Sequence, residues 1–393
     1  MTQGPQVAAF EKAFARYTGA EHACAVSNCT AALHLALQAV GVDAGDVVLT
    51  VSMSFIATAN AIRHCGAEPV FVDIDPATLN MCPDDLALRM ATDFEPRDGS
   101  LWYRHVERLT ASPSPLRRTA PPLGRLAAIL VVHQVGMPCD LRRIMPLARQ
   151  YGLPVVEDAA CAIGSEISLD GAQTWQRVGC PVGDVVCFSF HPRKVITTGD
   201  GGMLTTQNAE LDRTFRLLRQ HGMSLSDISR HNVQSVVFED YEITGFNHRM
   251  TDLQAAIGLI QLEKLPSILE ERKRVATAYR RLLRRLPVRV QTEPDYARFN
   301  WQSFQVQLEE PALQRPVMSA LLAHGIHSRR GVMTAHREPP YRAAWPEGSL
   351  PASEKTADCG IILPLFPTMS EEQVRRVVDA LTAALCSSTG VAA

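Results

Sequence analysis

The chain has 393 residues, of which 46% are hydrophobic and 20% are charged, and its formal net charge is −2. This length predicts a large domain and a smaller one, and the near-neutral charge gives no electrostatic support to a nucleic-acid partner. No apolar run is long enough to span a membrane, and ten scattered cysteines without a C-x-x-C pair favour reduced thiols in a cytoplasmic protein over a metal site or a disulfide framework.

The first two-thirds of the chain alternates helical spacing with short apolar runs that are typical of strands. We expect helices over Gln6–Tyr17, Thr30–Val40, Ile56–Cys65 and Leu141–Tyr151. We expect strands over Asp46–Val51, Pro69–Asp73, Ala127–Val132, Val155–Asp158, Val185–Phe190 and Gly201–Thr206. Continuous apolar strands separated by helices predict an α/β fold, in which helices cover both faces of a mostly parallel sheet.

The last third of the chain is mainly helical. Its periodic runs predict the helices Thr251–Leu265, Ser267–Leu286 and Glu371–Cys386. We expect Pro266 to separate the first two, because proline disrupts the interior of a helix. The pattern predicts a large domain over residues 1–260 and a smaller C-terminal α/β domain over residues 261–393.

The stretch Thr92–Leu126 differs from its surroundings in composition, because it holds five prolines and several arginines. Such a composition is typical of a surface loop or a partly disordered segment. We therefore expect one of these between the two strands that flank it.

Two motifs could bind a flat, phosphorylated ligand. The segment Ser27–Ala32 begins a predicted helix with Thr30 as its N-cap. A helix N-terminus offers free N–H groups and a positive dipole end to a phosphate, although capping alone is the simpler explanation for Thr30. Phe55 follows a strand, where α/β sheets bind ligands, and could stack on a heterocycle or be an ordinary core side chain.

Two further motifs place ionisable groups at strand ends. Asp158 ends an apolar strand, where a carboxylate can pair with a protonated pyridine nitrogen or cap the next helix. Lys194 lies on the loop after Val185–Phe190 and could form a Schiff base, although most lysines are solvated at the surface. Ser189 could reach a phosphate. The four motifs together supply the phosphate cradle, ring stack, N1 partner and Schiff-base lysine that pyridoxal 5′-phosphate (PLP) needs.

Other motifs run nearly from end to end of the chain. They are GVDAGDV at 41–47, GAEPVFVD at 66–73, GMPCD at 136–140, EDAA at 157–160, FSF with its lysine at 188–194, GDGG at 199–202, GFNHRM at 245–250, GI at 325–326 and LPL at 363–365. In this combination the chain resembles the DegT/DnrJ/EryC1/StrS family of fold-type I PLP enzymes, which are mostly nucleotide-sugar aminotransferases. The resemblance specifies a family and not a substrate.

The resemblance implies roles for the residues that match the family motifs. Lys194 resembles the lysine that holds PLP as an internal aldimine, and Asp158 resembles the carboxylate that pairs with N1. Phe55 matches the aromatic residue that stacks on the ring. Contacts to the phosphate are implied for Thr30, Ala31 and Ser189.

Asn247 is implied to reach the phosphate of the neighbouring subunit, which would make the enzyme a homodimer with shared sites. Two cysteines depart from the family pattern. Cys161 stands where His or Gln is common, near the O3′ side of the cofactor, and a thiol is a weak hydrogen-bonding group. Cys29 replaces the usual glycine before the phosphate-binding threonine. These departures bear on the substrate more than on the cofactor chemistry.

Three residues are predicted to bind substrate. Arg249 lies in the GFNHRM motif, and Arg330 and His336 lie in the polar run HSRRGVMTAHREPPY at 327–341. An arginine fork suits a diphosphate or a carboxylate, and a solvated surface run explains the same residues equally well.

The resemblance implies transfer of an amino group from glutamate or glutamine to a keto-sugar nucleotide. The alternative is a PLP-dependent lyase or condensation enzyme that acts on a non-sugar substrate. Family dehydratases replace the aldimine lysine with histidine, so Lys194 argues against that branch. The intact pair of Lys194 and Asp158 disfavours a binding protein without turnover, and the lack of G-x-G-x-x-G after the first strand excludes a nicotinamide enzyme.

Overall fold

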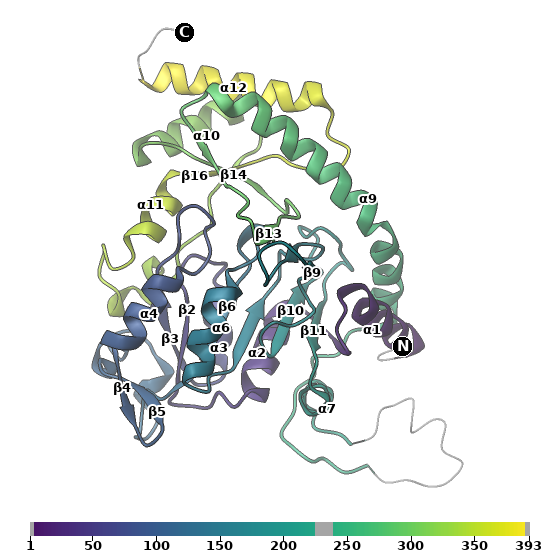
Figure 1. Ribbon diagram of the computed structural model, residues 1–393, viewed down its shortest axis with the longest axis vertical. Helices are drawn as coiled ribbons and strands as arrows, with labels where there is room; N and C mark the ends of the chain where they lie inside the picture. The colour runs from purple at the N-terminus through teal and green to yellow at the C-terminus, as the bar shows by residue number, and fades with distance from the viewer. Residues whose placement is uncertain (1–3, 225–238, 390–393) are drawn as a thin grey trace.

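A computed structural model describes residues 4–224 and 239–389 of the chain (Figure 1). Its helices are α1 (Pro5–Thr18), α2 (Cys29–Ala39), α3 (Ala57–His64), α4 (Pro83–Thr92), α5 (Val106–Leu109), α6 (Leu141–Gln150), α7 (Ala209–Leu218), α9 (Asp252–Leu282), α10 (Gln314–Ala323), α11 (Pro351–Cys359) and α12 (Glu371–Thr389). The strands of the large sheet are β1 (His22–Val26), β2 (Val47–Val51), β3 (Glu68–Val72), β6 (Leu126–Val132), β7 (Val155–Asp158), β10 (Val185–Ser189) and β11 (Gly202–Thr206). The remaining strands are β4 (Phe94–Arg97), β5 (Ser100–Tyr103), β8 (Glu166–Ile167), β9 (Gln176–Arg177), β12 (Arg289–Val290), β13 (Ala297–Arg298), β14 (Phe304–Gln307), β15 (Arg329–Arg330) and β16 (Gly360–Leu363).

The large sheet has seven strands in the order β1-β11-β10-β7-β6-β2-β3. Only β11 runs antiparallel to its neighbours, β1 and β10, and the other four pairings are parallel. This arrangement confirms the predicted α/β fold. The carboxyl ends of β2, β7 and β10 therefore lie at one edge of the sheet, where Asp158 and Ser189 end their strands.

Helices cover both faces of the sheet because successive strand residues point to opposite faces. Along β10, Val185 and Cys187 enter the core under α2, α3 and α7. Val186 and Phe188 enter the core that α1 and the first half of α9 close. Each face is thus sealed by apolar side chains, and the polar residues are left at the strand ends.

The long helix α9 corrects the prediction of two helices that Pro266 separates. Thr251 and Gln254 form a capping box at its start, and the helix continues through Pro266 to Leu282. Leu262 packs in the core beside α1, whereas Tyr279 packs in the core of the C-terminal sheet. Burial on both sides of the proline outweighs its local cost of about 3 kcal/mol. The predicted domain boundary at residue 260 falls inside this helix.

A second correction concerns the stretch Thr92–Leu126. It contains the hairpin β4–β5, the short helix α5 and the 3₁₀ turn Pro115–Arg118. Five hydrophobic side chains that precede β6 in this stretch are buried, namely Phe94, Leu101, Tyr103, Leu109 and Leu116. These isolated apolar residues stabilise a packed substructure, which the high proline and arginine content obscured in the sequence.

The C-terminal part forms a four-stranded sheet in the order β12-β14-β16-β15. Helices α10 and α12 pack together over it, and α9 runs from α1 along the side of the molecule to α12 (Figure 1). The predicted helix Glu371–Cys386 corresponds to α12. Among the described helices, none is long and apolar enough to cross a membrane.

Candidate active site

Lys194 is the only one of the five lysines that is partly buried, because Lys12, Lys264, Lys273 and Lys355 are all exposed. It lies on the loop that leaves β10, where its backbone N–H donates to the carbonyl of His191. Its Nζ donates to Cys161 Sγ at 3.1 Å. The environment of Lys194 therefore differs from that of a solvated surface lysine, which was the competing explanation.

The charge of Lys194 is set by opposing effects. Burial lowers the pKa of its amine, whereas the adjacent Cys161 thiol, together with Cys29 and Asp158, raises it. The net result is a pKa above the ordinary value for lysine. In the absence of a cofactor, the amine is thus held in its protonated form.

Asp158 is buried at the end of β7 and accepts hydrogen bonds only from neutral groups of the described chain. Its Oδ2 accepts from Thr58 Oγ1 at 2.8 Å, and its Oδ1 accepts from the N–H of Ala160 at 3.1 Å. Thr58 is in turn 2.8 Å from Ser54 through their hydroxyl oxygens. Thr58 and Ser54 were not predicted as site residues, although both lie in the motif around Phe55. These hydrogen bonds orient the carboxylate, and no cation of the described residues is hydrogen-bonded to it, so it can serve as the partner of a cationic ring nitrogen.

Phe55 follows β2 at the same edge of the sheet, and 65% of its surface is exposed. An ordinary core phenylalanine would be buried, so this observation excludes the competing explanation of Phe55. The ring offers an apolar face beside the helix that carries Thr58. It can stack on a planar ligand bound at this edge.

The first motif has a different N-cap from the predicted one. Asn28, and not Thr30, caps α2, because its side chain accepts from the N–H of Ala31 at 2.9 Å. Cys29 and Thr30 are consequently the first two residues of the helix, and their N–H groups have no intrahelical acceptor. The sequence did not distinguish Asn28 from Ser27 and Thr30, because all three residue types favour the N-cap position of a helix.

A close approach of two backbones brings Ser189 to the start of α2. Ser189 is paired in register with Gly202 on β11. A Cβ atom on Gly202 would lie 2.5 Å from the backbone carbon of Asn28, so only glycine allows this contact. The hydroxyl of Ser189 and the N-terminus of α2 therefore belong to one cradle, which fits a phosphate.

Asn247 and Arg249 follow one another closely but differ in exposure. Asn247 is exposed, and its backbone pairs with that of Gln220. Arg249 pairs through its backbone with Val26, next to the first motif, and its Nε is buried without a hydrogen-bond partner. An unpartnered guanidinium nitrogen beside the phosphate cradle suits an anionic ligand.

The other two predicted substrate residues lie in different surroundings. Arg330 is exposed and is 3.8 Å from Glu338 through Nη2 and Oε1. His336 is fully buried, with Nδ1 2.6 Å from Ser52 Oγ and Nε2 3.2 Å from Glu354 Oε1. Both ring nitrogens of His336 are therefore engaged within the protein, and the ring supports Ser52 at the end of β2.

Taken together, these groups fit PLP, which the family resemblance implied. Lys194 can carry the aldehyde carbon, the uncompensated Asp158 suits a protonated ring nitrogen, and the exposed Phe55 can cover the ring. The N-terminus of α2 with Ser189 suits the phosphate. Cys161, which the resemblance placed near O3′, accepts a hydrogen bond from Lys194 Nζ.

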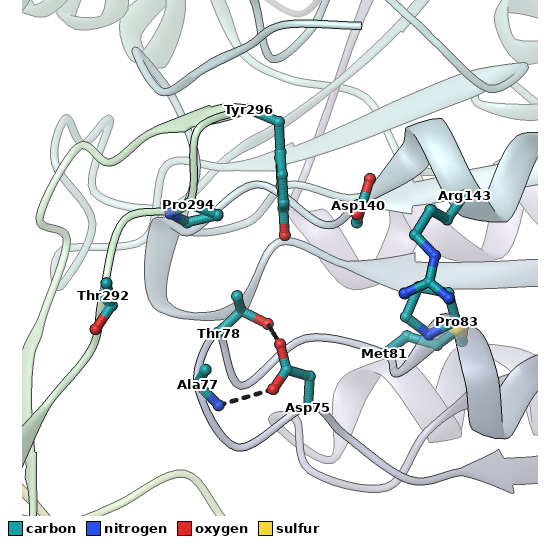
Figure 2. A pocket seen from close by; sticks show the side chains of 10 residues that line it. All are labelled: Asp75, Ala77, Thr78, Met81, Pro83, Asp140, Arg143, Thr292, Pro294 and Tyr296. Carbon is teal, nitrogen blue, oxygen red and sulfur yellow. Dashed lines mark hydrogen bonds between the residues drawn. The ribbon is translucent and has the colours of Figure 1, made fainter. Parts of the chain in front are cut away.

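A cavity of about 220 Å³ lies elsewhere and contains none of the predicted residues (Figure 2). Its wall comes from the loop after β3, the start of α6 and the segment before β13, with the residues Asp75, Ala77, Thr78, Met81, Pro83, Asp140, Arg143, Thr292, Pro294 and Tyr296. Asp75 is held by the N–H of Ala77 and the hydroxyl of Thr78. The volume of this cavity does not make it the active site, because it lacks the lysine and the carboxylate.

The family model of the DegT/DnrJ/EryC1/StrS aminotransferase family matches residues 1–382. The chain belongs to this family. It is an aminotransferase, and its cofactor is PLP. The family membership agrees with the lysine, carboxylate and phosphate cradle found at the sheet edge.

Relatives and solved structures cover nearly the whole chain. GDP-perosamine synthase of Caulobacter vibrioides is 38% identical over 383 residues, which are 96% of this chain and 90% of the relative. The spore coat polysaccharide biosynthesis protein SpsC of Bacillus subtilis is 34% identical over 388 residues, which are 97% and 90%. The structure of DesV from S. venezuelae, in complex with a ketimine intermediate, has a TM-score of 0.80 and 30% identity, and covers 98% of this chain and 90% of that one. These similarities support an aminotransferase that acts in sugar biosynthesis.

Proposed function

We propose that this enzyme transfers an amino group from glutamate or glutamine to a keto-sugar nucleotide. The observation that carries the proposal is the partly buried Lys194 at the same sheet edge as the buried Asp158, whose hydrogen-bond donors in the described chain are all neutral. The name of the relative GDP-perosamine synthase supports a nucleotide sugar as the acceptor. The exposed Phe55 supports an open site that accepts a large substrate.

Each of the site residues has a separate role in the proposed reaction. PLP, when bound, supplies an electron sink that stabilises negative charge on the substrate carbon. Lys194 holds the cofactor and, once the incoming amine has displaced it, moves a proton as a base near the reacting carbon. Thr58 and the N–H of Ala160 orient Asp158, whose charge favours the protonated ring nitrogen. The N-terminus of α2 and Ser189 hold the phosphate.

We propose Arg249 and Arg330 as contacts for the diphosphate of the acceptor. Arg249 has a buried Nε beside the first motif that is unpaired among the described residues, and Arg330 is exposed on β15, four residues before Thr334, whose backbone bridges to Met53 after β2. His336 contributes to the same region through Ser52 and not through direct contact with the substrate. Replacement of Arg330 by Ala is expected to raise KM for the nucleotide sugar while leaving PLP affinity unchanged.

We further propose a homodimer in which Asn247 serves the site of the partner. Three apolar side chains of α9 are exposed at helical spacing on one face, namely Leu253, Ile257 and Ile260. An apolar stripe of this kind on an otherwise polar surface is typical of an interface. All ten cysteines are free thiols, which supports a reducing, cytoplasmic location.

A single half-reaction tests the proposed function. The PLP form is mixed with glutamate or with glutamine in the absence of an acceptor, and the absorbance of the Lys194-bound cofactor is followed. We expect this absorbance to disappear as the pyridoxamine form and one equivalent of 2-oxo acid accumulate. A cofactor that no amino acid bleaches, although a substrate is still consumed, would favour the lyase or condensation alternative.

A further inference from the structure

A second cavity, of about 130 Å³, is lined by residues of the C-terminal sheet and of the segments next to it. Its polar wall consists of Gln302, Ser303, His327 and Arg329. The residues 362–365, at the end of β16, form the apolar wall. No acidic residue of the described chain lines it, so its electrostatic character is neutral to positive.

Hydrogen bonds tie this cavity to the groups around Lys194. Gln302 Nε2 donates to the carbonyl of Arg193 at 2.8 Å, one residue before the lysine. Asn300 Nδ2 donates to the carbonyl of Cys161 at 2.8 Å, and Asn300 Oδ1 accepts from the N–H of Gln302 at 2.9 Å. The wall of the cavity is thus connected to Arg193, which precedes Lys194 in the chain, and to Cys161, whose thiol contacts the Lys194 amine.

Gln302 has one polar atom that the protein leaves unused. Only 8% of its surface is exposed, and its Oε1 has no hydrogen-bond partner among the residues that the structure describes. Because Nε2 must face the carbonyl of Arg193, the unused atom is an acceptor, which requires an N–H donor. A buried acceptor without a partner is unfavourable, so a ligand that supplies an N–H would stabilise it.

Two arginines make the same region suitable for an anion. Arg329 lines the cavity from β15, is exposed and forms no ion pair with the described residues. Arg272 lies behind Gln302, where its Nη1 donates to the carbonyls of Trp301 at 3.0 Å and Gln302 at 3.3 Å. Burial without an opposing carboxylate lowers the pKa of the Arg272 guanidinium to about 10. The described residues therefore form no ion pair with Arg329, which lines the cavity, or with Arg272, which lies behind Gln302.

We propose that this cavity binds the α-amino acid end of the amino donor, with the α-carboxylate on Arg329 and an N–H of the α-amino group directed to Gln302 Oε1. An anion with an adjacent N–H satisfies both unused groups, and the tie from Gln302 to Arg193 brings that amino group to the side of the site where Lys194 lies. Glutamate and glutamine share this end. This subsite rests on the proposed function, because it assumes an amino-acid donor.

The test measures the donor half-reaction of Arg329→Gln against wild type over a range of glutamate and glutamine concentrations. We expect the half-saturating concentrations of both donors to rise by the same factor, roughly 10- to 100-fold, as for a lost charge-assisted hydrogen bond. The pyridoxamine form of the variant should need a similarly higher concentration of 2-oxoglutarate, which retains the carboxylate. PLP affinity and the cofactor spectrum should not change, because Arg329 is exposed and does not belong to the phosphate cradle.

Arg315→Gln is the matched control, because Arg315 is an exposed arginine on α10 that does not line the cavity. It should leave the dependence on both donors unchanged. An unchanged dependence in Arg329→Gln, or an effect on glutamate alone, would overturn the subsite while wild type is still bleached. If no amino acid bleaches wild type, the proposed function itself fails, and the two failures are therefore distinguishable.

Discussion

At the scale of single residues, the site is defined by which polar groups the protein satisfies and which it leaves for a ligand. Within the described chain, Asp158 receives two hydrogen bonds from neutral groups, and the first two residues of α2 have backbone N–H groups without an intrahelical acceptor. His336, in contrast, is engaged at both ring nitrogens. Polar groups whose hydrogen-bonding capacity the described residues leave unused are therefore better candidates for ligand contacts than residues chosen by type alone.

Asp158→Asn is expected to retain PLP but to lose activity by roughly 100-fold or more, the loss typical of one preorganised electrostatic contact. An amide carries no charge to hold the ring nitrogen protonated. Steady-state kinetics and the cofactor spectrum check this. Thr58→Val, which removes only the orienting hydroxyl, should cost less, and a wild-type rate in Asp158→Asn would remove Asp158 from its assigned role.

Cys161→Ala is expected to lower the pKa of Lys194 in the cofactor-free enzyme, because the thiol contributes most to raising it. Only the unprotonated amine reacts with PLP, so cofactor incorporation should become faster as pH rises, and the curve of the variant should lie at lower pH. Stopped-flow absorbance at a series of pH values measures both curves. The control is Cys180→Ala, which removes a partly exposed thiol that does not act on Lys194 and should leave the pH dependence unchanged. An equal shift in both variants would contradict the assignment of the pKa effect to Cys161.

Sequence patterns led us to predict Lys194, Asp158 and Phe55 as site residues because each belongs to a local motif at a strand end, and the structure places all three motifs at one edge of the sheet. They did not identify Thr58 as the partner of Asp158, or Gln302 as a neighbour of the Lys194 loop, because these contacts join segments far apart in the chain. The same limitation applies to the cap of α2. Several good capping residues stand in a row there, and only the packing of the loop against Gly202 selects Asn28.

At the scale of elements, α9 shows how tertiary packing overrides a local signal. Pro266 is exposed in the middle of this helix, whereas Leu262 and Leu265 before it and Val275 after it are buried. The helix continues because its two halves contact different cores. A periodicity argument cannot weigh this long-range burial against the cost of the proline.

Pro266→Ala is expected to raise the free energy of unfolding by roughly 1–2 kcal/mol. The substitution restores the missing helix hydrogen bond, and the greater freedom of the unfolded chain offsets part of the gain. Chemical denaturation monitored by circular dichroism measures the change. Ser267→Ala, at the next exposed position, should have a smaller effect, and a destabilised Pro266→Ala would indicate that packing requires the proline.

At the scale of the whole molecule, the apolar strands and intervening helices were sufficient to predict the α/β sheet, which the structure confirms. The compact substructure within Thr92–Leu126 was not predictable in the same way. Its buried residues are single apolar side chains among prolines and arginines, and they become a core only through contacts within the folded segment.

The apolar face of α9 leads to a prediction about assembly. Ile257→Asp should weaken self-association and reduce activity, because a buried carboxylate without a partner is strongly unfavourable at an interface. Sedimentation velocity and activity at matched concentrations measure the effect. Leu322→Asp, at an exposed leucine of α10, is the control that should leave the assembly intact. A fully active monomer of wild type would contradict the shared-site proposal.

The central claim is that Lys194 holds the cofactor, and reductive trapping tests it most directly. Borohydride is added to the PLP-bound enzyme, and the labelled peptide is mapped by mass spectrometry. The label is expected on Lys194 alone, because the other four lysines of the chain are exposed, whereas Lys194 is partly buried and its pKa responds to the charge of Asp158. Lys194→Ala should remain folded, take up no label and show no turnover. Stoichiometric label on Lys12, Lys264, Lys273 or Lys355 would contradict the account.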